Sequence, residues 1–191
     1  MKYLVFDIET RNTFEQVGSD LPSALDLSVL SIFDSRDNSM KSFEMNELDK
    51  AWPLFEGVDF LVGFNSDHFD IPLLDKYYPG DLHKIKSVDL MKSVRETLGR
   101  RIKLDNIAGA TLGKNKIGHG LDAIKWWNEG KIDLIRKYCE EDVYITRDVF
   151  LYALNNNKVF ANDREGKKIE IAINTDDWKA DEKEPEIQSL F

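Results

Sequence analysis

The chain has 191 residues, of which 42% are hydrophobic and 11% aromatic, an ordinary composition for one globular domain with a single core. Its single cysteine excludes an internal disulfide framework and a cysteine-rich zinc site. No apolar run approaches the roughly 18 residues that span a bilayer. The first residues do not form a signal peptide, because Asp7 arrives before an apolar stretch of useful length. We therefore expect a cytoplasmic protein without membrane contacts.

The net charge of −9 is unevenly distributed along the chain. Residues 84–125 contain ten Lys or Arg against four Asp or Glu, a net charge of +6, which leaves −15 for the remainder. A basic middle segment of this kind could contact phosphates while acids elsewhere hold metal ions. Scattered, solvated lysines would produce the same count, so the distribution alone leaves both interpretations open.

The first half of the chain predicts mainly strands. A run rich in β-formers at 3–8 predicts a strand, and the polar segment 11–28 predicts a loop. Strands at 29–33 and 39–44 flank the turn-forming residues 34–38, so they predict a hairpin. The later elements are expected in this order: a short helix at 47–56, an apolar central strand at 60–64, a helix at 67–77, a strand at 85–88, helices between 89 and 155, and a hairpin of strands 158–161 and 168–173. This order fits a mixed α/β layer fold, although order alone does not select one.

Two acids end the first predicted strand. Asp7 and Glu9 are two positions apart, so their side chains point to the same face. Adjacent carboxylates in a half-buried place repel each other and resist desolvation unless a cation is present. A divalent metal ion removes both penalties, and hard oxygen ligands suit Mg²⁺ or Mn²⁺. A strand that runs out into solvent with exposed acids at its tip would look the same, so that alternative stays open.

A third acid, Asp70, opens the helix predicted after the central strand. Leu73, Leu74 and Tyr77 follow at i+3, i+4 and i+7, which places the Asp70 carboxylate on the apolar stripe. Helix capping is a simpler explanation, with Asp67 as the N-cap and Asp70 as a capping-box acid. Taken alone, this pattern favours capping over a functional role.

The last long helical segment carries a fourth acid, Asp142, within its apolar stripe. At about 100° per residue, Ile135 and Val149 lie within about 60° of Asp142, whereas Asp148 lies about 120° away on the polar flank. A carboxylate inside an apolar stripe is costly without a partner, and a buried lysine or arginine is one candidate partner. Tyr138, four residues earlier on the same face, is near enough to act at the same site.

Together these segments resemble the DEDD superfamily of 3′–5′ exonucleases. Its first motif looks like Phe6-Asp7-Ile8-Glu9-Thr10, its second like Asn65 to Asp70 with Ile71-Pro72-Leu73-Leu74 after it, and its third, Tyr-x-x-x-Asp, like Tyr138 to Asp142. The tyrosine in the third motif is typical of the tyrosine branch of that superfamily. The second motif is most similar to the proofreading domains of family-B DNA polymerases and their stand-alone bacterial and viral relatives. The resemblance covers about residues 1–155.

The resemblance implies an RNase H-like α/β fold, with a mixed five-stranded sheet in the order 3-2-1-4-5 flanked by helices and an extra C-terminal β-hairpin. It implies an exonuclease domain over residues 1–155, on which the hairpin at 156–173 packs. Residues 174–191 are acidic and aperiodic, and we expect a flexible tail there. The tail ends in Leu190-Phe191 and resembles peptides that dock on sliding clamps of the replisome, although a disordered end with two chance hydrophobic residues is the simpler interpretation.

The two-metal mechanism of the superfamily assigns roles to the matching residues. It implies that Asp7, Glu9 and Asp142 hold one divalent ion, Mg²⁺ or Mn²⁺, and that Asp7 bridges to a second ion. Asp70 would bind the second ion directly or through water. Tyr138 would orient the attacking water, and the product would be a nucleoside 5′-monophosphate released from the 3′ end of single-stranded DNA or RNA.

Five further residues are candidates for substrate binding. The resemblance implies that Asn65 contacts the terminal nucleotide, that Phe69 packs beside the second-motif acid, and that the Thr10 N–H approaches the 3′ terminus. Lys114 and His119 lie in a basic, glycine-containing segment that could touch backbone phosphates, and a solvated loop is the alternative.

Two other features are interpreted as structural. Asp89 follows a strand-like run, where a helix N-cap is favoured over a position next to metal ligands. Trp126 and Trp127 on a predicted helix are interpreted as core residues and not as a platform for stacked bases.

The sequence leaves three functions in competition. The first is a 3′–5′ exonuclease that favours DNA. The second is an RNA-directed or structure-selective nuclease on the same site, because the metal chemistry does not distinguish the two sugars. The third is a non-catalytic nucleic-acid or replisome adaptor that retains the fold. The presence of all four acids and the tyrosine favours an enzyme.

Overall fold

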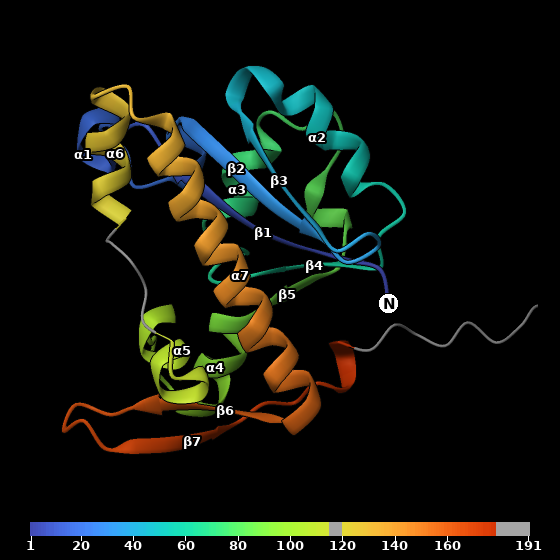
Figure 1. Ribbon diagram of the computed structural model, residues 1–191, viewed down its shortest axis with the longest axis vertical. Coiled ribbons are helices and arrows are strands. Elements are labelled where there is room, and N and C mark those ends of the chain that lie inside the picture. Colours follow the sequence, from blue (N-terminus) through green and yellow to red (C-terminus); the bar gives the residue numbers. More distant parts are fainter. Residues whose placement is uncertain (115–119, 179–191) are drawn as a thin grey trace, which may run out of the picture.

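The computed structural model describes residues 1–114 and 120–178 and builds a five-stranded sheet in the order β3-β2-β1-β4-β5 (Figure 1). The strands are β1 (Tyr3–Thr10), β2 (Leu27–Asp34), β3 (Ser39–Glu44), β4 (Phe60–Gly63) and β5 (Ser87–Asp89). β2 pairs antiparallel with β1 and β3, whereas β4 pairs parallel with β1 and β5. This mixed sheet is the expected RNase H-like arrangement, and the predicted strand order is confirmed.

Helices cover both faces of the sheet. They are α1 (Phe14–Val17), α2 (Leu48–Phe55), α3 (Asp70–Asp75), α4 (Leu90–Leu98), α5 (Leu104–Leu112), α6 (Gly120–Asn128) and α7 (Ile132–Asn156). α7 has 25 residues and crosses one face of the sheet diagonally, in contact with β1, β2 and β4 (Figure 1). Within the described ranges, no helix combines the length and the apolar character that a membrane span requires.

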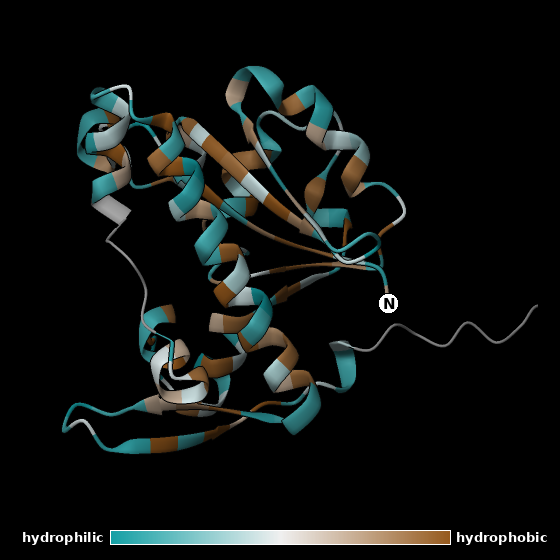
Figure 2. Ribbon diagram, viewed as in Figure 1, coloured by the Kyte–Doolittle hydropathy of each residue, from teal (hydrophilic) through white to brown (hydrophobic). Residues whose placement is uncertain are grey.

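The residues of the central strand β1 alternate between two hydrophobic cores. Leu4 and Phe6 belong to the core packed with α2 and α3, while Val5 belongs to the core built around α4, α5 and α7. β1, β2 and β4 are accordingly hydrophobic along most of their length (Figure 2). Because strand side chains alternate, Asp7 and Glu9 continue the face of Val5 and lie on the α7 side. The packing of the sheet therefore decides where the first two acids point.

The predicted C-terminal hairpin is confirmed as β6 (Lys158–Asn162) paired antiparallel with β7 (Lys168–Ala172). Its inward-facing side chains, among them Val159 and Ile171, are buried in the core around α7. The Thr111 hydroxyl of α5 donates to the carbonyl of Phe160 in β6 at 2.9 Å, which ties the hairpin to that helix.

The segment 174–178 departs from the expected loose tail. Thr175 is buried, and its hydroxyl donates to Asn157 Oδ1 at 2.7 Å. Trp178 is buried as well, and its ring stacks on Phe150 of α7 with centroids 5.5 Å apart. A large apolar ring gains more from burial than its acidic neighbours lose, so the core extends five residues further than the charge pattern indicates. Residues 179–191, with the predicted clamp-docking peptide, lie outside the described residues.

Candidate active site

Three of the four predicted metal-binding acids meet at the end of β1. Asp7, Glu9 and Asp142 each offer a carboxylate oxygen, and these three atoms lie within 4.8 Å of one another. Asp7 is half-buried, whereas Glu9 and Asp142 are buried. The structure therefore brings together acids that are separated by more than 130 positions in the chain.

The end of β1 is shaped by an irregularity in its pairing with β2. Glu9 pairs with Val29, but the register shifts and Thr10 pairs with Leu27, so Ser28 has no partner position. A bulge of this kind increases the local twist and redirects the last side chains of a strand. The turn after β1 is held by the Arg11 N–H, which donates to the carbonyl of residue 26 at 3.0 Å. The strand that carries the first two acids thus ends in a fixed conformation.

The helix α7 supplies the third acid from its buried face, as the sequence predicts. Asp142 is 4% exposed and Tyr138, one turn earlier, is 3% exposed. The Tyr138 ring packs edge-on against Trp126 of α6 with centroids 5.8 Å apart, which supports a packing role for that tryptophan. Asp148 lies on the outer flank, where it forms ion pairs with Arg147 at 2.7 Å and Lys114 at 2.5 Å.

The fourth acid, Asp70, lies beside the carboxylate cluster but does not belong to it. Asp70 is the first residue of α3 and is buried. Burial, the nearby charge of Asp89 and, to a smaller extent, that of Asp142 together raise the pKa of its carboxyl to about 8. A hydrogen bond from the backbone of Ile8, between Asp7 and Glu9, opposes this rise. Asp70 is thus close to both elements that form the cluster.

The capping explanation for Asp70 is wrong. The N-cap position of α3 is Phe69 and not Asp67, and Phe69 makes no side-chain capping bond. The segment before α3 turns tightly instead, because Asn65 adopts a left-handed conformation with φ of 66° and its carbonyl accepts the N–H of Phe69 at 3.0 Å. This turn shortens the helix predicted at 67–77 to Asp70–Asp75 and places Asp70 at its buried start.

Asp89 has a second role that the sequence analysis missed. It caps α4 as predicted, accepting the N–H of Met91 at 2.9 Å. The same carboxylate also accepts the N–H of Asn65 at 2.8 Å and the N–H of Asp67 at 3.2 Å. Burial raises the pKa of its carboxyl, and the backbone donors limit that rise. Asp89 therefore holds the turn that leads into Asp70, and an acid placed directly after a short strand was the available signal.

Cys139 is a second residue that sequence reasoning did not place at the site. Its thiol is buried on α7 and lies 3.3 Å from the backbone oxygen of Asp7 and 3.6 Å from Asp7 Oδ2. Burial raises the pKa of the thiol well above its usual value, and the charge of Asp7 raises it further. The thiol is therefore protonated and can donate a hydrogen bond to Asp7.

The structure describes four of the five predicted substrate-binding residues. Thr10 follows Glu9, and its hydroxyl donates to the carbonyl of residue 12 at 3.1 Å. Phe69 packs edge-on against an aromatic ring of α1, and Asn65 lines a pocket next to α4. Lys114 is directed to the outer flank of α7 by its ion pair. His119 lies outside the described residues, and the binding roles of all five stay predictions.

The set of donors at the end of β1 fits a divalent cation. Three carboxylates this close repel one another, and the two buried ones also lack solvent. A hard divalent ion such as Mg²⁺ or Mn²⁺ prefers carboxylate oxygens and would neutralise this repulsion. Asp7, Glu9 and Asp142 are the residues able to hold it, with Asp70 adjacent.

Comparison with known proteins identifies the fold and the superfamily of the chain. The structure is similar to a family B DNA polymerase from the hyperthermophilic archaeon Pyrobaculum calidifontis, with a TM-score of 0.63 and 21% sequence identity over 81% of this chain. The chain spans about a quarter (24%) of that polymerase, and a likeness at this identity shows a shared fold only. No curated protein sequence matches the chain significantly. Residues 4–153 match the RNase H superfamily, a range that includes most of α7 and all of the five-stranded sheet except Tyr3. The chain therefore belongs to the RNase H superfamily, and this membership supports a nuclease function.

Proposed function

We propose that the protein is a metal-dependent 3′–5′ exonuclease that hydrolyses phosphodiester bonds at the 3′ end of single-stranded nucleic acid, with DNA favoured over RNA. The observation that carries this proposal is the meeting of Asp7, Glu9 and Asp142 within 4.8 Å on the α7 face of β1. The motifs that contain these acids resemble those of the DEDD exonucleases, and the superfamily match is consistent with that resemblance.

The acids at the end of β1 form the catalytic centre in this proposal. Asp7, Glu9 and Asp142 would hold a first divalent ion, and Asp70 together with Asp7 would hold a second. When bound, such ions supply Lewis-acid activation of the phosphodiester and lower the pKa of a water molecule. The protein supplies the fixed placement of the carboxylates, on a central strand and on a 25-residue helix that packs across it.

Tyr138 positions the attacking water in this proposal. It lies one helical turn before Asp142 on the same buried face, so the Tyr138 side chain and the Asp142 carboxylate lie on the same side of the helix. A phenol titrates near pH ~10, which is too high for an efficient general base at neutral pH. We therefore assign Tyr138 to orientation of the water and expect Tyr138→Phe to slow hydrolysis less than the loss of a carboxylate does.

Digestion of 3′-labelled single-stranded DNA and RNA in the presence of Mn²⁺ tests this function. We expect the wild type to release labelled nucleoside 5′-monophosphate, and Asp142→Asn to lower the rate by at least about 10³-fold, because one metal ligand is lost. Asp133→Asn is the matched control, since Asp133 is exposed on the same helix. Equal rates for the wild type and Asp142→Asn would exclude this site as the catalytic centre.

The competing functions predict different results in the same assay. An RNA-directed or structure-selective nuclease would act on RNA, or on duplex junctions, more rapidly than on single-stranded DNA, and blocked 3′ and 5′ ends distinguish the direction of attack. A non-catalytic adaptor would bind these substrates without releasing mononucleotides. Docking of the tail on a sliding clamp stays a prediction, and equal recovery on a clamp of the full chain and of a chain lacking residues 186–191 would exclude it.

A further inference from the structure

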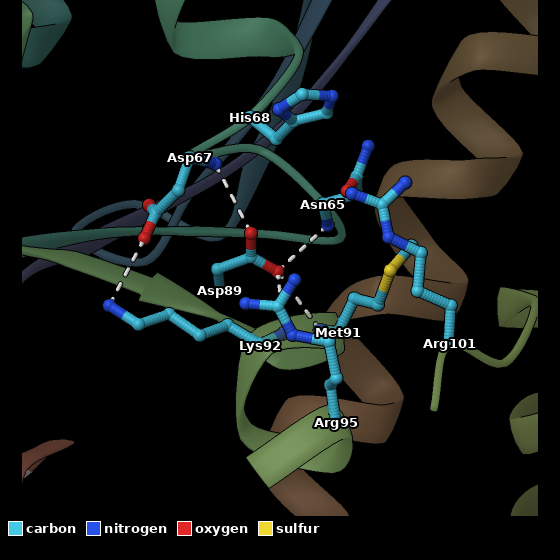
Figure 3. Close-up of a pocket in the computed structure, with 8 residues that line it drawn as sticks. All are labelled: Asn65, Asp67, His68, Asp89, Met91, Lys92, Arg95 and Arg101. Atoms are coloured by element: carbon cyan, nitrogen blue, oxygen red, sulfur yellow. Dashed lines mark hydrogen bonds and ion pairs between the residues drawn. The ribbon is translucent and has the colours of Figure 1, made fainter. Parts of the chain in front are cut away.

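A basic pocket lies next to Asn65, on the α4 side of the sheet. It has a volume of about 310 Å³ and opens to solvent. Eight residues line it: Asn65, Asp67, His68, Asp89, Met91, Lys92, Arg95 and Arg101. Figure 3 shows the side chains of Arg95 and Arg101 extending toward the turn that carries Asn65. The basic middle segment of the sequence therefore contributes three cationic side chains to one cavity.

Asp89 lines the pocket and lies near Asp70, the acid beside the carboxylate cluster. The Asp89 carboxylate faces the pocket and accepts the N–H of Asn65 at 2.8 Å. It also lies close enough to Asp70 to affect that carboxyl group electrostatically. A strand whose 3′ end reaches the acids can therefore pass Asn65 and continue over the pocket.

The positive charge of the pocket is available for a ligand. Lys92 forms an ion pair with Asp67 at 3.6 Å, and Asp89 is occupied by backbone N–H groups. The guanidinium groups of Arg95 and Arg101 are exposed and form no hydrogen bond or ion pair with the part of the chain that the structure describes. Guanidinium groups bind phosphate oxygens in a bidentate manner, and an arginine with a purely structural role would be expected to have an acidic partner.

A second cavity extends this basic surface away from the acids. It has a volume of about 470 Å³ and shares Arg101 with the first pocket. Arg100 and Lys103 also line it. The two cavities therefore meet at Arg101, and cationic side chains line both of them, from the turn at Asn65 to the segment between α4 and α5.

We propose that this pocket is a subsite for the backbone phosphates of the strand upstream of its 3′-terminal nucleotide. Arg95 and Arg101 donate to the non-bridging oxygens of a phosphate that precedes the scissile bond, and the surface around Arg100 and Lys103 receives the next part of the strand. This inference rests on the proposed function, which requires a single strand to reach the acids. It explains how a chain with a net charge of −9 binds a polyanion, because its cations are concentrated where the strand lies.

The dependence of hydrolysis on substrate length tests the subsite. We compare the ratio of kcat/KM for a decanucleotide to kcat/KM for a dinucleotide in the wild type and in the double variant Arg95→Ala/Arg101→Ala. We expect the ratio to fall by at least about tenfold in the variant, since only the longer strand reaches the pocket. A distortion of the catalytic centre would lower both rates and leave the ratio unchanged, which would overturn the proposal.

The matched control removes the same charge elsewhere. Arg164 and Lys167 are exposed in the turn between β6 and β7, and Arg164→Ala/Lys167→Ala is expected to keep the wild-type ratio. An equal fall in both double variants would mean that general charge, and not this pocket, attracts the strand.

Binding measured without turnover separates this proposal from the proposed function. In EDTA, fluorescence anisotropy with a 5′-labelled single-stranded decanucleotide should show about tenfold weaker binding by Arg95→Ala/Arg101→Ala, and a salt dependence whose slope is lower by about 0.7 for each lost phosphate contact. Equal affinities and slopes would overturn the subsite even if the wild type digests nucleic acid. A wild type that binds through these arginines but releases no mononucleotide would overturn the exonuclease and retain the subsite.

Discussion

The Asp142 side chain shows how strongly a buried charge depends on its partners. It is 4% exposed, and its carboxylate is grouped with those of Asp7 and Glu9. Without a cation, each carboxylate lies beside two others of the same sign, and the buried Glu9 and Asp142 are also desolvated, which destabilises the folded state. A divalent ion that binds only the folded protein removes this repulsion, so metal binding and stability are linked.

Metal ions should therefore stabilise the wild type more than Asp142→Asn. We expect Mn²⁺ at about 100 times its dissociation constant to add roughly 2.7 kcal/mol to the unfolding free energy of the wild type. Asp142→Asn loses a ligand and a repulsive charge, so it should melt no lower than the wild type in EDTA and respond less to Mn²⁺. Thermal melts followed by circular dichroism measure both effects, and a wild type that does not respond to Mn²⁺ would contradict the site.

Cys139 should contribute to metal affinity through Asp7. Its protonated thiol lies 3.3 Å from the backbone oxygen of Asp7 and 3.6 Å from Asp7 Oδ2, so it can help to fix the position of this ligand. We expect Cys139→Ala to weaken Mn²⁺ binding about tenfold, at the lower end of the range for residues that orient metal ligands, and Cys139→Ser to retain most of the affinity. Isothermal titration calorimetry measures this. If alanine and serine weaken binding equally, Cys139 is a packing residue only.

Sequence periodicity predicts the acids but not the residues that hold them. The inward direction of Asp7, Glu9 and Asp142 follows from the repeat of a strand and of a helix, which are local properties. The contacts of Asp89 with the turn at Asn65, and of Cys139 with Asp7, depend on how β5 and α7 pack against β1 and β4. Tertiary packing of that kind has no local period, so the sequence indicates only the N-cap role of Asp89.

At the scale of elements, one arginine joins the β2–β3 turn to the end of α2. Arg36 donates to Asp34 Oδ2 at 2.6 Å and to the carbonyls of Leu54 and Glu56 at 2.8 and 2.9 Å. Asp34 is buried at the end of β2, and its hydrogen bonds from Arg36 lower the pKa of its carboxyl. The arginine thus satisfies carbonyls that the end of a helix leaves without partners.

Removal of this arginine should destabilise the protein in a pH-dependent manner. Because the pKa of Asp34 is lowered in the folded state, the pair stabilises the protein above the ordinary carboxyl pKa and loses this effect as pH falls through the lowered value. We expect Arg36→Met to lower the free energy of unfolding by about 3 kcal/mol at pH 7. The deficit should shrink below about pH 4 as Asp34 takes up a proton. Urea denaturation at pH 7 and below about pH 4 measures this difference in unfolding free energy between the wild type and the variant. A difference that does not change with pH would contradict the ion pair.

The boundaries of the elements were predicted less well than their order. β3 occupies the predicted residues 39–44, but the predicted loop 11–28 contains α1 and the start of β2. α1 is a single turn that begins with a capping box in which Thr13 and Gln16 exchange hydrogen bonds, a signal visible in the sequence. A helix of four residues has no apolar period, so only its cap could have revealed it.

At the scale of the whole molecule, the hairpin and residues 174–178 complete the core around α7. Trp178 packs on Phe150, which in turn contacts Tyr3 and Phe60 of the sheet. The C-terminal end of the described chain therefore closes the same core from which β1 and α7 present the acids. The acidic composition of this segment predicts that it is solvent-exposed. Burial of the Trp178 ring stabilises the folded protein more than exposure of its charged neighbours would, and composition alone does not reveal this.

Loss of the Trp178 ring should destabilise the protein substantially. We expect Trp178→Ala to lower the unfolding free energy by about 3–5 kcal/mol, the usual range for truncation of a buried aromatic residue. Trp178→Phe should retain much of the stability because it keeps a ring against Phe150. Urea denaturation followed by circular dichroism measures both variants, and a loss below about 1 kcal/mol for alanine would show that the segment is not part of the core.

The placement of the acids on β1 and on α7 has a consequence for biosynthesis. β1 emerges from the ribosome first, and α7 follows after the rest of the sheet, so an incomplete chain holds only two of the three carboxylates. Such a chain cannot assemble the proposed catalytic centre, whatever the concentration of metal ions. Under the proposed function, hydrolysis of nucleic acid then begins only after α7 has been synthesised and has docked on the sheet, so no separate inhibitor is needed during synthesis.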